Sequence, residues 1–99
     1  MSKPIKNLQL FNDLCATEET LIERGWCKNR PNNINGAVCL MKAASEVVDC
    51  SGDYYLRLYA VEKALESVIG RNPVCFNDDP TTTFDDVLTK LREAREKLL

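Results

Sequence analysis

Apolar residues recur at three- and four-residue steps along most of this chain, which is the period of an amphipathic helix. The first such stretch covers residues 5–24, and Gly25 is placed to end a helix there in the left-handed conformation. Thr17 leaves a second interpretation open, because it could cap a separate short helix over residues 18–23. The apolar positions of this stretch are Leu8, Leu10, Phe11, Leu14, Cys15, Leu21 and Ile22.

Two further helices are expected in the middle of the chain. The second helix covers residues 36–49, with Asn35 as its N-cap at the end of a loop rich in Asn. The third helix has Asp53 as its cap, continues through Ile69 and ends at Gly70. Their apolar positions are Val38, Cys39, Met41, Ala44, Val47 and Val48 in the second and Tyr55, Leu58, Val61, Leu65 and Val68 in the third.

The last helix has the clearest start. Thr83 and Asp86 have the spacing of a capping box, in which Asp86 takes the position usually held by Glu or Gln. Its buried face is expected to contain Phe84, Val87, Leu88, Leu91, Ala94 and Leu98. The sequence has no repeat and no strand pattern, so we expect an all-α fold, a single compact domain of about four helices over residues 1–99.

Length, composition and charge limit the classes of function. Ninety-nine residues supply apolar material for one core, and the 44% hydrophobic content is ordinary for a globular protein. No apolar run approaches the roughly 20 residues of a membrane helix, and the start lacks the apolar region of a signal peptide. We therefore expect a cytoplasmic protein with no membrane association. The net charge is −2 and basic residues gather only at Lys28 and Arg30, so we expect no nucleic-acid binding.

The chain contains no histidine, the commonest general base near neutral pH and the commonest metal ligand. This excludes Ser-His-Asp and Cys-His catalytic arrangements and the zinc sites that need histidine. The chain also has no Gly-rich phosphate loop, so a nucleotide site of the common kinds is not expected. We therefore expect no cofactor and favour a non-enzymatic function.

Five cysteines are present without any C-x-x-C pair: Cys15, Cys27, Cys39, Cys50 and Cys75. We interpret them as small core residues that stay reduced in the cytoplasm. A disulfide would form only if the protein were exported or were oxidised during preparation. Cys27, which precedes Lys28, and Cys39, in the first turn of its helix, are the candidates for a reactive thiol. A zinc site from Cys27, Cys39, Cys50 and Cys75 is an alternative that the wide spacing disfavours.

Four carboxylates lie just before and at the start of the last helix, namely Asp78, Asp79, Asp85 and Asp86. They could hold a hard cation, but their spacing does not match the EF-hand loop. We interpret the first two as turn residues before Pro80 and the other two as part of the helix cap, and we predict no metal site.

Three aromatic residues are candidates for specific contacts. Trp26 follows the glycine that ends the first helix, and we interpret it as a hydrophobic lid on the core, with recognition as the alternative. Tyr55 and Tyr59 share one side of the third helix, and this side would suit a surface that contacts a partner.

Several short motifs occur in one order: Leu21-Ile22-Glu23-Arg24-Gly25-Trp26-Cys27, then Gly36-Ala37-Val38-Cys39-Leu40 with Ala43 and Ala44, then Phe76-Asn77-Asp78 and Thr83 to Val87. This order resembles DUF6197, a family of small helical proteins of bacteria and their phages with no established activity. The resemblance implies a four-helix fold, a bacterial or phage origin and no catalytic residue. It also implies that five residues lie together in space, namely Trp26, Cys27, Cys39, Asn77 and Asp78.

These observations favour a non-enzymatic protein–protein interaction module, which binds a protein partner or itself through a helical face containing Tyr55 and Tyr59. A phage- or mobile-element-encoded accessory or inhibitor protein fits this class. The alternative is a small-molecule or thiol-dependent site formed by the Trp26-Cys27 and Asn77-Asp78 loops. A helical domain that acts within a larger assembly is a third hypothesis, which the sequence does not separate from the first.

Overall fold

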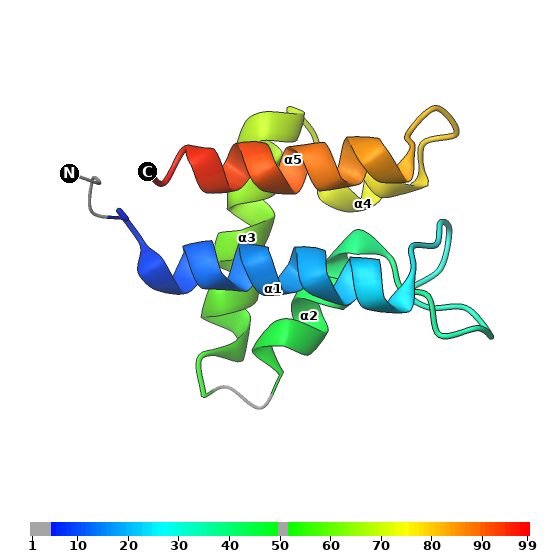
Figure 1. Ribbon diagram of the computed structural model, residues 1–99, viewed down its shortest axis with the longest axis horizontal. Helices are drawn as coiled ribbons and strands as arrows, with labels where there is room; N and C mark the ends of the chain where they lie inside the picture. The colour runs from blue at the N-terminus through cyan, green and yellow to red at the C-terminus, as the bar shows by residue number, and fades with distance from the viewer. Residues whose placement is uncertain (1–4, 50–51) are drawn as a thin grey trace.

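The computed structural model describes residues 5–49 and 52–99 and has the predicted all-α fold, with one hydrophobic core (Figure 1). Within the described residues no strand is formed, and only two isolated β-bridges occur. In Figure 1 the first and last helices lie side by side and antiparallel, and the third crosses behind both. The helices are α1 (Leu8–Arg24), α2 (Leu40–Val48), α3 (Tyr54–Ile69), α4 (Pro73–Asp78) and α5 (Phe84–Glu96).

The core is built from fully buried aliphatic side chains of four helices and of the segment before α2. Burying a leucine completely stabilises a fold by roughly 1.5–3 kcal/mol, so the five buried leucines dominate this core. The small side chains of Ala43 and Ala44 let α2 pack closely against its neighbours. The core residues are Leu14, Leu21, Val38, Leu40, Ala43, Ala44, Val61, Leu65, Val87, Leu91 and Ala94.

The first helix differs from the sequence prediction in its boundaries and in two face residues. It begins at Leu8 and not at residue 5, because the Asn7 side chain caps it. It continues without a break through Thr17, whose hydroxyl donates to the carbonyl four residues earlier. Gly25 ends the helix at φ 91° and ψ 162°, which is not the left-handed helical conformation. Leu8 and Ile22, both predicted on the apolar face, are exposed.

The start of α2 was predicted four residues too early. Asn35 is not the N-cap; Cys39 is, and its sulfur accepts a hydrogen bond from the Lys42 amide. The three residues before Cys39 stay out of the helix because Val38 forms β-bridges with Trp26 and Asn32. Long-range pairing has therefore overridden the local Asn-Gly signal at this position.

The third helix is close to its prediction. Asp53 lies at the N-cap position, although its side chain makes no capping hydrogen bond, and Gly70 ends the helix in the left-handed conformation as predicted. Val61 and Leu65 are buried as expected, but Tyr55, placed on the same apolar face by the sequence, is 84% exposed.

The segment between α3 and α5 contains the helix that sequence analysis missed. α4 has only six residues, begins after Asn72 and includes the Asn77-Asp78 pair that was interpreted as a loop. The capping box of α5 is confirmed, because Thr83 and Asp86 exchange both side-chain-to-backbone hydrogen bonds. No helix in the described ranges is long and apolar enough to cross a membrane.

Candidate functional site

Asn77, in the last turn of α4, lies at the centre of the region that the sequence singled out. It is only 1% exposed, and both atoms of its amide group are engaged. Its Oδ1 accepts hydrogen bonds from Trp26 Nε1 at 2.6 Å and from the Leu40 amide at 3.0 Å. Its Nδ2 donates to the Cys27 carbonyl at 3.1 Å and to Asp78 Oδ1 at 2.9 Å. One side chain thus joins α4, the start of α2 and the loop after α1.

Trp26 closes the core at this point. Its ring stacks on Phe84 with centroids 5.8 Å apart and an interplanar angle of 7°. Lys28 Nζ lies 5.3 Å from the indole centroid and donates to the Asp79 carbonyl at 2.6 Å. The indole is therefore held between α5 and a cation, as expected of a lid on the core.

The loop after Trp26 is fixed by Asp78. The Asp78 carboxylate accepts from the Asn29 amide at 2.8 Å, and Asn29 adopts φ 65°, a left-handed conformation that Asn tolerates better than most residues. Lys28 and Asn29 are thus both tied to the end of α4. The Asn77-Asp78 motif holds the loop in place, a role with no signal in the local sequence because its partners lie 49 to 51 residues away.

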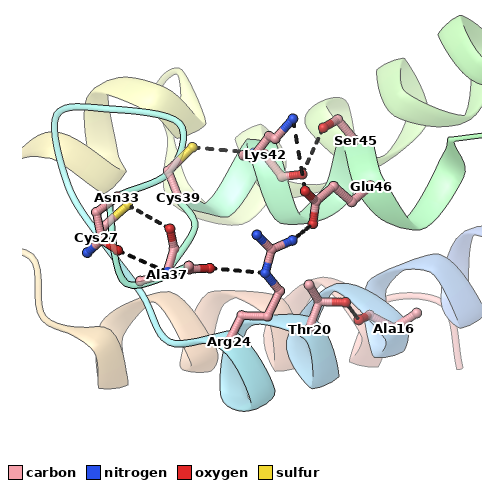
Figure 2. A network of polar contacts seen from close by, with 11 residues as sticks. Ala16, Thr20, Arg24, Cys27, Asn33, Ala37, Cys39, Lys42, Ser45 and Glu46 are labelled. Carbon is pink, nitrogen blue, oxygen red and sulfur yellow. Dashed lines mark hydrogen bonds and ion pairs between the residues drawn. The ribbon is translucent and has the colours of Figure 1, made fainter.

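The remainder of the loop closes on itself and on α1 (Figure 2). The Asn33 amide donates to the Ala37 carbonyl at 2.9 Å, and Asn33 Oδ1 accepts from the Ala37 amide at 3.1 Å. Arg24, at the end of α1, donates from Nε to the Gly36 carbonyl at 3.0 Å and pairs with Glu46 of α2. Only the tip stays outside these contacts, where Ile34 is 97% exposed.

The two candidate thiols have different surroundings (Figure 2). Cys27 is buried, and its thiol lies 3.5 Å from both the Arg30 and the Ala37 carbonyl oxygens. Burial raises the pKa of the Cys27 thiol, so it stays protonated at neutral pH. Cys39 is half-buried at the N-cap of α2, and its sulfur accepts the Lys42 amide hydrogen bond at 3.3 Å.

The other cysteines only partly fit the prediction of core residues. Cys15 is half-buried and Cys75 is exposed, and both are free thiols. Cys50, proposed as a zinc ligand, lies outside the described residues.

A groove of about 390 Å³ opens beside this network. It lies between the 29–31 loop, the start of α2 and α4, and its lining includes Arg30, Cys39, Lys42, Val74, Asn77 and Asp78. Of the five predicted ligand-binding residues, Cys39, Asn77 and Asp78 reach the groove. Trp26 and Cys27 contact Asn77 but do not line the groove.

The four carboxylates that the sequence places near the start of α5 are not gathered around one point. Asp79 accepts from Thr81 and pairs with Arg71 at 2.7 Å, whereas Asp86 caps α5. The Thr81 hydroxyl and amide, followed by Arg71, hold the pKa of Asp79 well below its usual range. Across residues 5–49 and 52–99, no three His, Cys, Asp or Glu side chains are grouped so that they could hold a metal ion.

A second surface lies on the first half of α3. Tyr55 and Tyr59 are 84% and 59% exposed, and between them Leu56, which sequence analysis did not single out, is 74% exposed. Leu56 also lines a shallower groove of about 240 Å³ between α1 and α3.

This groove also contains the Asp13–Arg57 ion pair, which sequence analysis did not predict. Asp13, only 3% exposed, accepts from Arg57 at 2.6 and 3.1 Å and from Gln9 at 3.1 Å. The hydrogen bonds that Arg57 donates to the Asp13 carboxylate raise the pKa of the Arg57 guanidinium.

Comparisons with known proteins identify the chain at the family level alone. No curated protein and no solved structure matches it. The model of DUF6197, a family of unknown function, matches residues 10–97, which is nearly the whole chain. The motifs that suggested this resemblance are those that build the Asn77 network and the α5 cap. The chain therefore belongs to the family DUF6197.

Proposed function

We propose that this protein is a non-enzymatic module that binds another protein through the first half of α3. The observation that carries the proposal is the exposure of Tyr55, Leu56 and Tyr59, three large apolar side chains within five residues. Aromatic side chains are enriched in protein interfaces, where they lose little conformational entropy and bury a large area. A bacterial or phage accessory protein belongs to the same proposal.

The surroundings of these side chains support a protein partner. The groove beside Leu56 offers an apolar wall from Leu10 and Ala60 and the charged Asp13–Arg57 pair. Apolar anchors beside a fixed polar group are typical of the centre and rim of an interface. Lys63 lies 5.3 Å from the Tyr59 ring centroid, so the cation also helps to orient one anchor.

The double variant Tyr55→Ser/Tyr59→Ser tests this surface. Both side chains are exposed, so the variant should keep the wild-type helical circular dichroism while losing association. We would measure self-association by sedimentation equilibrium and partner binding by affinity capture with quantitative mass spectrometry. Ile34→Ser, which removes an apolar side chain that is 97% exposed in another region, is the matched control.

Two patterns of outcome decide the proposal. A partner or oligomer that is lost in the tyrosine variant and kept in Ile34→Ser supports the α3 surface. Equal association of wild type and the tyrosine variant contradicts it.

A second candidate function rests on the groove beside Cys39. Its volume of about 390 Å³ lies within the range of about 300–1,000 Å³ found for small-molecule sites. The charged groups of Arg30, Lys42 and Asp78 in the lining could orient a polar ligand. A native mass spectrum of gently purified protein tests this candidate, because a bound ligand adds mass that disappears on denaturation.

The Val74→Trp variant is the control for this measurement. Val74 lines the groove and is 47% exposed, so a larger side chain fills the groove without entering the core. Added mass in the wild type that is absent from Val74→Trp supports a ligand in the groove. Added mass that persists in the variant, or the bare polypeptide mass in both proteins, contradicts this candidate.

A further inference from the structure

The backbone pairing around Val38 brings two cysteines into register. Val38 forms a parallel bridge with Trp26, in which the Val38 amide donates to the Gly25 carbonyl at 2.9 Å and the Cys27 amide donates to the Val38 carbonyl at 3.1 Å. The residues that follow the bridge on the two segments are Cys27 and Cys39. In a parallel pair such residues project to the same face, and the two backbones lie about 4.8 Å apart.

Cys27 and Cys39 directly follow the bridged pair, so their backbones are neighbours, as a disulfide requires. Two cysteines can be bridged without backbone movement when their Cα atoms lie about 4.4–6.8 Å apart and their side chains leave the same face. The electrostatic environment agrees with such proximity, because after burial the charge of Cys39 is the next cause that raises the pKa of Cys27. Both residues are free thiols, so the pair is in its reduced form.

The two thiols differ in their access to solvent. Cys39 is half-buried and lines the open groove beside Arg30 and Lys42, so it is the better placed of the two to meet a small oxidant. Cys27 is buried and does not line the groove. This arrangement of one accessible sulfur and one protected sulfur is typical of a redox-sensing pair, in which the accessible cysteine reacts and the second resolves the product.

We propose that Cys39 and Cys27 form a reversible disulfide in response to a peroxide. The Cys39 thiol loses its proton, and the thiolate attacks the hydroxyl oxygen of the peroxide. The O–O bond breaks, the attacked oxygen stays on sulfur as a Cys39 sulfenic acid, and the other oxygen takes the proton and leaves as water or alcohol. The Cys27 sulfur then attacks the sulfenic sulfur, the S–O bond breaks, and a second water leaves with the Cys27 proton. A dithiol reductant returns both cysteines to thiols and is itself oxidised to a disulfide.

The disulfide would alter the start of α2. The Cys39 sulfur now accepts the Lys42 amide hydrogen bond as the N-cap, and turning toward Cys27 removes that acceptor. The Leu40 amide remains bound to Asn77, so the helix stays attached to α4. Oxidation therefore changes one wall of the groove while the Asn77 network stays in place. This inference does not depend on the α3 surface or on a groove ligand.

Peptide mapping of the full-length protein after hydrogen peroxide treatment tests the proposal. Remaining thiols are blocked with N-ethylmaleimide, and the protein is digested with trypsin without reduction. Cleavage after Arg24, Lys28 and Lys42 separates the two cysteines into peptides 25–28 and 29–42. We expect these two peptides to be linked, with a mass lower than their sum by two hydrogen atoms, and to separate after dithiothreitol treatment.

Three variants assign the roles of the cysteines. In Cys39→Ser, where serine is itself a good N-cap, Cys27 should remain alkylatable after peroxide. In Cys27→Ser, Cys39 should stop at the sulfenic acid and react with dimedone. Cys75→Ser, which removes an exposed thiol, should form the same link as the wild type. Circular dichroism establishes that each variant is folded, and if Cys27→Ser is not, the wild-type map and Cys39→Ser decide alone.

Other products would overturn the proposal. Peroxide that oxidises Cys75 or Cys15 while peptides 25–28 and 29–42 stay unlinked would show that the register does not support a disulfide. A linked pair that forms only after denaturation in urea would contradict it as well, because the reaction would not use the native geometry.

Discussion

At the scale of single residues, Asn77 has the largest structural role among the candidate site residues. An amide side chain can accept two hydrogen bonds and donate two, and Asn77 makes all four within the protein. Its chemistry is therefore already used to hold the loop and α2 against α4. The groove wall it forms is a rigid support, and Arg30, Lys42 and Asp78 are better placed to meet a ligand.

Replacing this residue should have a large effect on stability. Asn77→Ala leaves the Trp26 indole N–H and the Leu40 amide without their acceptor in a buried region, so we expect a loss of about 3 kcal/mol in the free energy of unfolding. Urea denaturation measures this loss. Asn12→Ala, at an exposed position of α1, is the matched control and should change stability by less than about 0.5 kcal/mol. Equal stability of the two variants would contradict the role of Asn77 in holding the loop and α2 against α4.

Asp79 should make stability dependent on acidic pH. Its folded-state pKa is depressed by hydrogen bonds from Thr81 and Arg71, whereas in the unfolded chain an aspartate has a pKa of about 3.9. Its stabilising contribution is therefore complete above that pH and is lost as the pH falls from there toward the lower folded-state pKa. We expect the Tm of the wild type to fall more steeply below about pH 4 than that of Asp79→Asn.

Thermal unfolding monitored by circular dichroism at a series of acidic pH values measures this difference. Glu19→Gln, which removes an exposed carboxylate from the middle of α1, should follow the wild-type slope. If Asp79→Asn and wild type have parallel Tm profiles, the contacts of Asp79 do not stabilise the folded state.

At the scale of helices, side-chain caps set the starts of four of the five described helices. Asn7, Cys39, Asn72 and Thr83 each accept a hydrogen bond from a backbone amide of the first turn. These contacts satisfy amides that have no partner within the helix. The helix starts are thus determined by local chemistry wherever no distant segment competes.

The α5 cap offers a direct measurement of this contribution. Thr83→Ala removes the hydroxyl half of the capping box, and we expect a loss of about 1 kcal/mol in the free energy of unfolding. Thr89→Ala, at an exposed position inside the same helix, changes the same residue type without touching a cap. A loss as large in Thr89→Ala would mean that the effect comes from the substitution and not from the cap.

The same scale explains what the sequence could and could not predict. The apolar period was sufficient to identify α1, α3 and α5 as helices, because each of them spans several turns. α4 was missed because six residues are too few to show a period. α2 was started too early because Asn35-Gly36 has local signals of a helix start, whereas the bridges of Val38 are made with residues that no local pattern identifies. Sequence analysis singled out Asn77, but its role in holding the loop depends on contacts across the fold.

At the scale of the whole molecule, Trp26 connects parts of the chain that are distant in sequence. It contacts α4 through Asn77, α5 through Phe84 and the segment before α2 through Val38. The core side chains of α1, α2, α3 and α5 form one continuous cluster. Loosening any of these helices should therefore disturb the surroundings of the indole.

This arrangement predicts a single cooperative unfolding transition. Fluorescence of Trp26, the only tryptophan, and helical circular dichroism should give the same midpoint in urea, with a slope of about 1–3 kcal/mol per molar urea. The two signals should also shift together in Thr83→Ala, because loss of the α5 cap lowers the stability of the whole domain. A fluorescence transition at lower urea than the loss of helix would mean that the Trp26 region opens separately from the helical core.

The loop between Trp26 and α2 is a place where the chain can be lengthened. The hydrogen bonds between Asn33 and Ala37 close its base, and only residues 34–36 extend beyond them. Enlarging a loop whose ends are already held costs only about 0.6 kcal/mol for each doubling of its length. Extra residues at Ile34 would project into solvent and leave the Asn77 network and the two cysteines in register. This tip is therefore the place where a label, an epitope or a natural insertion could enter the chain without rebuilding the fold.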